Sequence, residues 1–189
     1  MKKALLAVAK FIVWNIAATF AVIGVSIINS EMGKLFGDTV KYCVSAPIAE
    51  EIMKATFSAL GCPWGGYVLG ALEFNQYVFS LGVAMELRVP QLLFHTATGI
   101  VYAVVCKFRN IKGLTQAAES RVFAGVLWAI ILLHAISNSR GDILPIPHWV
   151  GGIWVGFIEK PVYYIVELSV YAIVAIAGIL YLNYKKKGD

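Results

Sequence analysis

Two adjacent glutamates, Glu50 and Glu51, lie inside an apolar segment that is long enough to cross a lipid bilayer, and Lys54 follows them. A bilayer-spanning helix needs about 20 predominantly apolar residues. Each ionisable side chain at that depth costs roughly 2.5–3.5 kcal/mol on insertion scales. Such groups read by default as a functional site, so any fold of this chain must surround residues 46–54 with other polar groups.

The rest of the sequence is also strongly apolar. Of the 189 residues, 59% are hydrophobic and 14% are charged, whereas about a quarter are charged in a typical soluble domain. The chain 1–189 is therefore predicted to be a single polytopic membrane domain, with a motif-bearing core over about 42–139. Its fold class is predicted as all-α integral membrane, with about six transmembrane helices in one bundle over residues 4–29, 42–60, 67–84, 91–106, 122–138 and 161–183.

Basic residues gather in three places: the first ten residues, the connection 107–121 and the tail 185–187. Six crossings put all three clusters on one side, which the positive-inside rule identifies as the cytoplasm. We therefore expect both termini to be cytoplasmic, in a multi-pass protein of the cell membrane of a prokaryote. Because these clusters flank the apolar segments, the net charge of +5 points to the lipid bilayer as a partner, and no nucleic-acid role is expected.

The segment 140–160 differs from the predicted spans. It contains Pro145, Pro147 and several glycines among aromatic residues, so it is too broken to span a membrane and too apolar for a free loop. Non-helical backbone at membrane depth is tolerated where protein or a wet cavity satisfies it. A re-entrant or interfacial segment before the last helix is therefore predicted.

Three further predicted helices supply polar groups that could meet the glutamates. They carry Glu73 with Tyr77, His95, and His134 with Asn138. The members of each pair are four residues apart and so share one helix face. At about 1.5 Å of rise per residue, the predicted helix bounds bring these groups together in the outer half of the bilayer.

This set of residue types is suited to peptide-bond hydrolysis, which needs a water, a base and donors for the developing oxyanion. Burial and a second nearby carboxylate both raise the pKa of a carboxylic acid, which makes it a fitting base. Glu50 and Glu51 project about 100° apart on a helix, so they cannot face one cavity equally. Lys54 can reach either of them, and the sequence leaves open which one is the base and which is tethered.

The motifs resemble those of the PrsW family of intramembrane proteases, within the CAAX-protease and bacteriocin-processing superfamily. Residues 50–54 look like its EExxK motif, and residues 72–77 resemble FExxxY with Leu72 in place of the phenylalanine. Residues 134–138 resemble its HxxxD/N-type motif. The resemblance covers about residues 46–139.

The wider superfamily patterns fit less well. Ala55 stands where EExxxR requires arginine, and Gln91 stands where FxxxH requires phenylalanine. The narrower family implies an intramembrane endopeptidase that cleaves a membrane-anchored protein or peptide at the extracytoplasmic side. Its substrate would be similar to an anti-sigma factor, a prenylated protein or a leader peptide.

The resemblance also implies a role for each residue. Glu50 or Glu51 would activate water together with His95, while His134 and Asn138 would bind the oxyanion. Superfamily members have been described as glutamate-dependent and as metal-dependent; we expect no cofactor here, with zinc as the alternative. The supporting residues would be Lys54, Glu73 and Tyr77. The zinc ligands, if present, would be Glu50, His95 and His134.

Two other functions are compatible with the sequence. The superfamily includes a catalytically inactive scaffold in the γ-secretase complex, so this chain could be a membrane scaffold of the same fold. It could also be a small proton-coupled transporter that uses its acids and histidines as a relay. Many transporters show internal repeats, and none is evident here, so a protease remains the main prediction.

Overall fold

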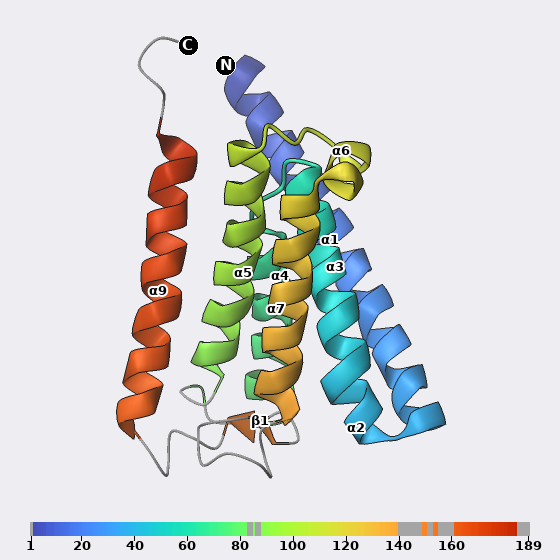
Figure 1. Cartoon of the computed structure of the whole chain (residues 1–189). Helices are drawn as coiled ribbons and strands as arrows, with labels where there is room; N and C mark the ends of the chain where they lie inside the picture. Colours follow the sequence, from blue (N-terminus) through green and yellow to red (C-terminus); the bar gives the residue numbers. More distant parts are fainter. Residues whose placement is uncertain are drawn as a thin grey trace.

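The computed structural model describes residues 2–82, 85, 88–139, 149–150, 153–154 and 161–184. Its helices form an elongated bundle (Figure 1). Two short strands, β1 (Trp149–Val150) and β2 (Ile153–Trp154), pair antiparallel. The helices are α1 (Lys2–Phe36), α2 (Asp38–Val40), η1 (Lys41–Ser45), α3 (Ala46–Ala59), α4 (Gly65–Asn75), η2 (Gln76–Ser80), α5 (Val89–Phe108), α6 (Leu114–Glu119), α7 (Arg121–Ser139) and α9 (Pro161–Asn183).

Within the described residues, two helices are long and apolar enough to cross a membrane. They are Leu5–Phe36 in α1 and Val89–Phe108, which is α5. Shorter apolar stretches of α7 and α9 cover Arg121–Ile136 and Leu168–Asn183. The prediction of about six transmembrane helices is therefore wrong. Helix α3 has only 14 residues and carries three ionisable side chains, and α4 has only 11 residues.

The error arises from helix length: the apolar runs 42–60 and 67–84 do not form single α-helices, because the π-helical turns η1 and η2 occupy part of them. Apolar content also does not distinguish lipid from protein surroundings: α5 qualifies as a span, although half of its apolar window is buried within the bundle. The cytoplasmic placement of both termini was derived from the six-helix count and falls with it. The predicted re-entrant segment 140–160 lies outside the described residues, apart from strands β1 and β2.

Helix α3 continues from α2 through the π-helical turn η1, without a break at Pro47. Ser45 does not cap a separate helix here, because its backbone is helical and its side chain makes no cap bond. Its hydroxyl instead donates to Oδ1 of Asn29 at 2.7 Å. A π-turn shifts the local hydrogen-bond register, which accommodates the proline, a residue with no N–H to donate.

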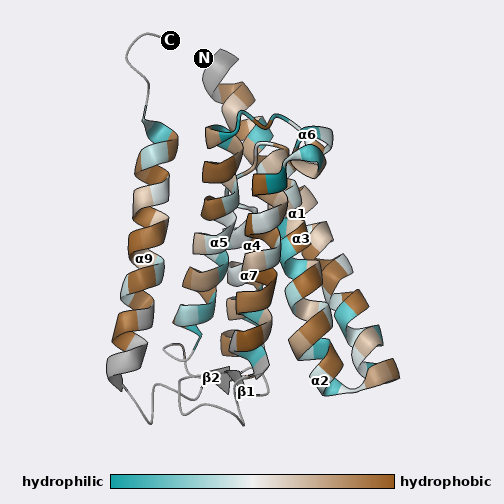
Figure 2. Ribbon diagram, in the orientation of Figure 1, coloured by the Kyte–Doolittle hydropathy of each residue, from teal (hydrophilic) through white to brown (hydrophobic). Residues whose placement is uncertain are grey.

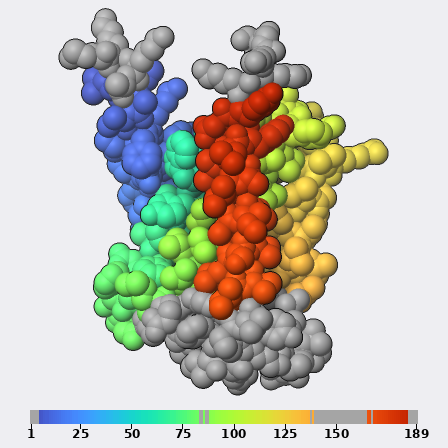
Figure 3. All heavy atoms as spheres, turned by 90° about the vertical axis from the view of Figure 1, so that its left-hand side faces the viewer, coloured from blue at the N-terminus to red at the C-terminus, as the bar shows by residue number. Residues whose placement is uncertain are grey.

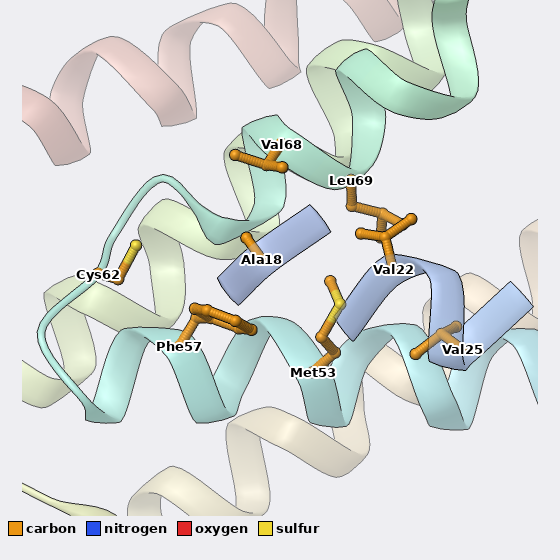
Figure 4. Packing of buried hydrophobic residues seen from close by; sticks show 8 residues of the cluster. All are labelled: Ala18, Val22, Val25, Met53, Phe57, Cys62, Val68 and Leu69. Carbon is orange, nitrogen blue, oxygen red and sulfur yellow. The ribbon is translucent and has the colours of Figure 1, made fainter. Parts of the chain in front are cut away.

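Helix α3 is packed on two sides. On one side Met53 and Phe57 join Ala18 and Val22 of α1 and Leu69 of α4 in a hydrophobic cluster (Figure 4). On the other side α3 shares a second hydrophobic cluster with α5, α6 and α7. Burial of a large apolar side chain stabilises a fold by about 1.5–3 kcal/mol. These clusters therefore fix the position and rotation of the helix that carries the two glutamates.

Helices α4 and α5 approach each other closely at two glycines. A Cβ atom on Gly66 would lie 2.1 Å from the backbone oxygen of His95, and one on Gly99 would lie 3.0 Å from Cα of Gly66. Helix α9 runs along the flank of α5 (Figure 3), where Gly178 faces Ile100. Helix α5 is thus held between α4 and α9, which fixes the height of His95.

Candidate functional site

The centre of the bundle contains a cluster of acids, imidazoles and one lysine. Glu50, Glu51 and Lys54 of α3 are 6%, 0% and 0% exposed, and they meet His95 of α5 and His134 of α7. Burying charges without partners is very costly. The structure therefore brings the main predicted site residues together, and the contacts below give each a distinct environment.

Glu51 is held by three donors. Its Oε1 lies 2.5 Å from Nζ of Lys54 and 2.8 Å from Nδ1 of His134. Its Oε2 accepts a hydrogen bond of 3.0 Å from the hydroxyl of Tyr102. A carboxylate accepts such charge-assisted bonds well, so Glu51 joins α3, α5 and α7 and is the tethered glutamate.

Glu50 has different neighbours. Its Oε2 lies 3.9 Å from Nε2 of His95 and 3.9 Å from Nε2 of His134. Glu73 of α4 approaches the same region, with its Oε2 3.2 Å from Nε2 of His95. Glu73 also accepts a hydrogen bond from Nε2 of Gln91. The two glutamates of α3 thus separate as their 100° offset requires, with Glu50 directed to the open side of the cluster.

That open side is a cavity of about 1100 Å³ between α1, η1, α3, α4, α5 and α7. Glu51 and Lys54 do not line it. Its wall includes polar side chains from every one of these elements, so it can hold water or a polar group near the acids. Those that bear on the site are Glu50, Glu73, Tyr77, Arg88, His95, His134 and Asn138.

Two predicted site residues have structural contacts in addition to lining the cavity. Nδ2 of Asn138 donates to the backbone oxygen of Tyr42 at 2.8 Å, which ties α7 to η1. The ring of Tyr77 stacks on the guanidinium of Arg88, with Cζ 3.5 Å from the ring centroid. This cation–π contact closes one wall of the cavity, since Arg88 is only 1% exposed.

An aromatic side chain from α5 separates the imidazoles from α9. The ring centroid of Phe94 lies 4.9 Å from that of His134, 5.5 Å from that of His95 and 5.6 Å from that of Tyr171, each with edge-to-face geometry. Such pairs prefer this tilted arrangement. Phe94 therefore limits the rotation of both imidazole rings.

Sequence reasoning missed several of these residues. Thr98, whose Oγ1 accepts from Nζ of Lys54 at 2.8 Å, and Tyr102 follow His95 by three and seven residues, so helical periodicity could have placed them on the same face. Arg88 precedes α5 and reads as a helix-end residue, and no local signal indicates that it is buried. Phe94 carries no signal either, because a phenylalanine in an apolar helix is ordinary.

Three ligand atoms lie close enough to hold a metal ion: one each from Glu50, Glu73 and His95, all within 4.8 Å of one another. Of the three predicted zinc ligands, Glu50 and His95 belong to this group, and Glu73 takes the place of His134. A metal-binding histidine normally donates its second ring N–H to an acceptor. Here the second nitrogen of His95, Nδ1, lies 3.1 Å from the ammonium of Lys54, which is a donor. The group therefore does not fit a metal bound through Nε2 of His95.

No family model, curated protein or solved structure matches this chain. The resemblance to the PrsW family therefore stays a prediction that depends on the motif residues. The structure itself defines a coarser class, a helical bundle with a buried acid–imidazole cluster at the wall of a polar cavity. Two of its helices could cross a membrane.

Proposed function

We propose that this protein is an intramembrane endopeptidase, which hydrolyses a peptide bond of a membrane-anchored protein or peptide. The observation that carries the proposal is the triangle of Glu50, His95 and His134, contributed by three helices. Both Nε2 atoms lie 3.9 Å from Oε2 of Glu50, and all three residues line one cavity. A base, a donor and room for water are the minimum that peptide hydrolysis requires.

The proposed membrane location is supported by the surface of the bundle. Helix α1 exposes large apolar side chains along its length, including Leu5 (73%), Phe20 (70%) and Leu35 (71%). Hydrophobic residues also recur along α5, α7 and α9 (Figure 2). Soluble monomers rarely expose apolar surface on this scale. We therefore place the protein in a lipid membrane, with α1 and α5 as the helices that could cross it.

Glu50 is the better candidate for the base. The oxygens of Glu51 already accept three bonds from Lys54, His134 and Tyr102, and Glu51 does not line the cavity. Glu50 meets the imidazoles only at 3.9 Å, a separation that leaves its carboxylate available to a water. A general base must be within hydrogen-bond reach of the proton that it removes.

The cavity also suits an extended peptide. Its volume of about 1100 Å³ is slightly above the range of about 300–1,000 Å³ for small-molecule sites. A peptide bond can be attacked only where the substrate helix is unwound, and an unwound backbone at membrane depth needs polar partners. Thr19, Ser26 and Asn29 of α1 also line the cavity and could provide them.

The test compares wild type with the Glu50→Gln variant, purified in detergent and incubated with single-span membrane proteins that carry a fluorescent reporter. We expect product formation by wild type and a loss of about 10²–10⁴-fold for the variant, the usual contribution of a general base. The matched control is Glu31→Gln, because Glu31 is a half-exposed surface residue of α1 bonded to Lys34. Equal cleavage by wild type and Glu50→Gln would overturn the proposal. A stably folded wild type that cleaves nothing would favour the scaffold.

A further inference from the structure

Lys54 makes three contacts that use the whole donor capacity of its ammonium group. It is fully buried, and Nζ lies 2.5 Å from Oε1 of Glu51, 2.8 Å from Oγ1 of Thr98 and 3.1 Å from Nδ1 of His95. An ammonium has three N–H donors and no acceptor. Thr98 can accept because its own hydroxyl hydrogen is donated to the backbone oxygen of His95 at 3.2 Å. Each of these three groups must therefore present a lone pair to Lys54.

For His95 this requirement selects one tautomer. Because Nδ1 accepts from Lys54, the ring proton must lie on Nε2, since a neutral imidazole has one donor and one acceptor nitrogen. Nε2 faces the acids, 3.2 Å from Oε2 of Glu73 and 3.9 Å from Oε2 of Glu50. The contact with Glu73 is not aligned as a hydrogen bond, and among the described residues Nε2 has no aligned partner. His95 is completely buried, so a donor is held ready at the cavity wall.

For His134 the same reasoning selects the opposite tautomer. Its Nδ1 lies 2.8 Å from Oε1 of Glu51, a carboxylate oxygen that can only accept. Nδ1 therefore carries the proton, and Nε2 of the neutral ring presents its lone pair to the cavity. Nε2 lies 3.9 Å from Oε2 of Glu50, so one water can direct its two hydrogens at these two acceptors.

We infer that Lys54 and Glu51 set the two imidazoles in opposite hydrogen-bonding roles, with His95 the donor to the oxyanion and His134 an acceptor that orients the water. This inference rests on the proposed function and reverses the roles that the family resemblance implied. The water oxygen bonds to the carbonyl carbon of the scissile peptide bond while one water proton passes to Glu50. The C=O electron pair moves to the carbonyl oxygen, which accepts a hydrogen bond from Nε2–H of His95. The oxyanion pair then re-forms the C=O bond as the C–N bond breaks, and Glu50 gives that proton to the leaving nitrogen. Lys54 is a positioning residue.

The direct test is nitrogen NMR of the full chain, labelled with ¹⁵N-histidine, in detergent micelles. The chain has three histidines, so His95→Gln and His134→Gln variants assign the signals. We expect a protonated Nε2 for His95 and a protonated Nδ1 for His134. Protonation of Nδ1 in His95, or of Nε2 alone in His134, would overturn the inference. This readout does not depend on cleavage: the expected tautomers without peptidase activity would refute only the proposed function.

The second measurement uses the Lys54→Met variant, which keeps the length of the side chain and removes its donors. We expect the His95 spectrum to shift toward protonated Nδ1. We also expect kcat to fall by about 10²–10³-fold, the usual cost of one oxyanion donor, with KM changed less than about threefold. Lys54→Arg, which retains donors, should restore part of the kcat. The control is Lys112→Met, since Lys112 is exposed. An unchanged His95 spectrum in a folded Lys54→Met protein would refute the positioning role.

Discussion

The buried ion pair between Lys54 and Glu51 makes the strongest prediction about stability. Both side chains are 0% exposed and lie 2.5 Å apart, so solvent does not screen them. The Lys54→Met substitution leaves the Glu51 carboxylate buried without its cation, and such a loss costs about 3–5 kcal/mol. The hydrogen bonds from Tyr102 and His134 remain in place. We therefore expect a fall of about this size in the free energy of unfolding.

The double variant Lys54→Met with Glu51→Leu separates this cause from simple loss of packing. Replacing both members of a buried pair with apolar residues is often neutral or stabilising. The hydroxyl of Tyr102 then loses its acceptor, which costs about 1–3 kcal/mol, while neutral His134, which also loses Glu51, can carry its proton on Nε2 at the cavity wall. We expect the double variant to be more stable than Lys54→Met alone, although it carries one more substitution.

The assay is equilibrium unfolding in mixed micelles, followed by fluorescence of the five tryptophans. The chain offers a matched control, because Glu31 and Lys34 form a pair of the same i, i+3 spacing at 2.7 Å with side chains 57% and 67% exposed. Exposed pairs contribute about 0–1 kcal/mol, so Lys34→Met should change little. The reasoning is refuted if Lys54→Met costs no more than Lys34→Met, or if the double variant loses the sum of the two single effects.

Three further outcomes follow from the geometry. Gly66→Ala should destabilise the protein by at least about 1–3 kcal/mol, because its Cβ would meet the backbone of His95. The control Gly24→Ala should not, because its Cβ would have nothing within 4 Å. Equal unfolding curves for the two variants would contradict the close packing of α4 on α5. Tyr102→Phe should cost about 1.5–3 kcal/mol by removing the hydrogen bond to Glu51, and an unchanged unfolding midpoint would show that this bond contributes nothing. A metal chelator should leave cleavage unchanged, since the ammonium of Lys54 lies beside Nδ1 of His95; activity that is lost on chelation and regained with zinc would disprove this.

Part of the candidate site could be predicted from local spacing. Ionisable side chains inside apolar segments need polar partners, so the carboxylates, the imidazoles and Lys54 could be recognised as one site, and spacings of three or four residues place Lys54 near the glutamates and Asn138 near His134. The partners Thr98 and Tyr102 obey the same periodicity. Arg88 and Phe94 could not be predicted, because a residue before a helix and a phenylalanine within one carry no sign of what they will contact.

The number of membrane-crossing helices, by contrast, depends on tertiary structure. Composition shows how apolar a segment is, but not where its helix begins and ends: residues 42–60 and 67–84 are apolar, yet α3 and α4, which form there, have only 14 and 11 residues. The length and the burial of a helix depend on its contacts with other segments, so the composition of one segment does not determine them. The six-helix prediction failed for this reason.

The amino-acid sequence by itself determined that polar groups on separate helices had to share a buried site, because isolated charges in apolar surroundings are too costly. Only the tertiary structure decided which glutamate faces the cavity and which nitrogen of each imidazole carries the proton. It also decided that Lys54 contacts both Glu51 and His95. These properties depend on distances of about 3 Å between side chains more than 40 residues apart in the chain. Hydrogen bonds are that short and directional, so the rotation of each packed helix determines them.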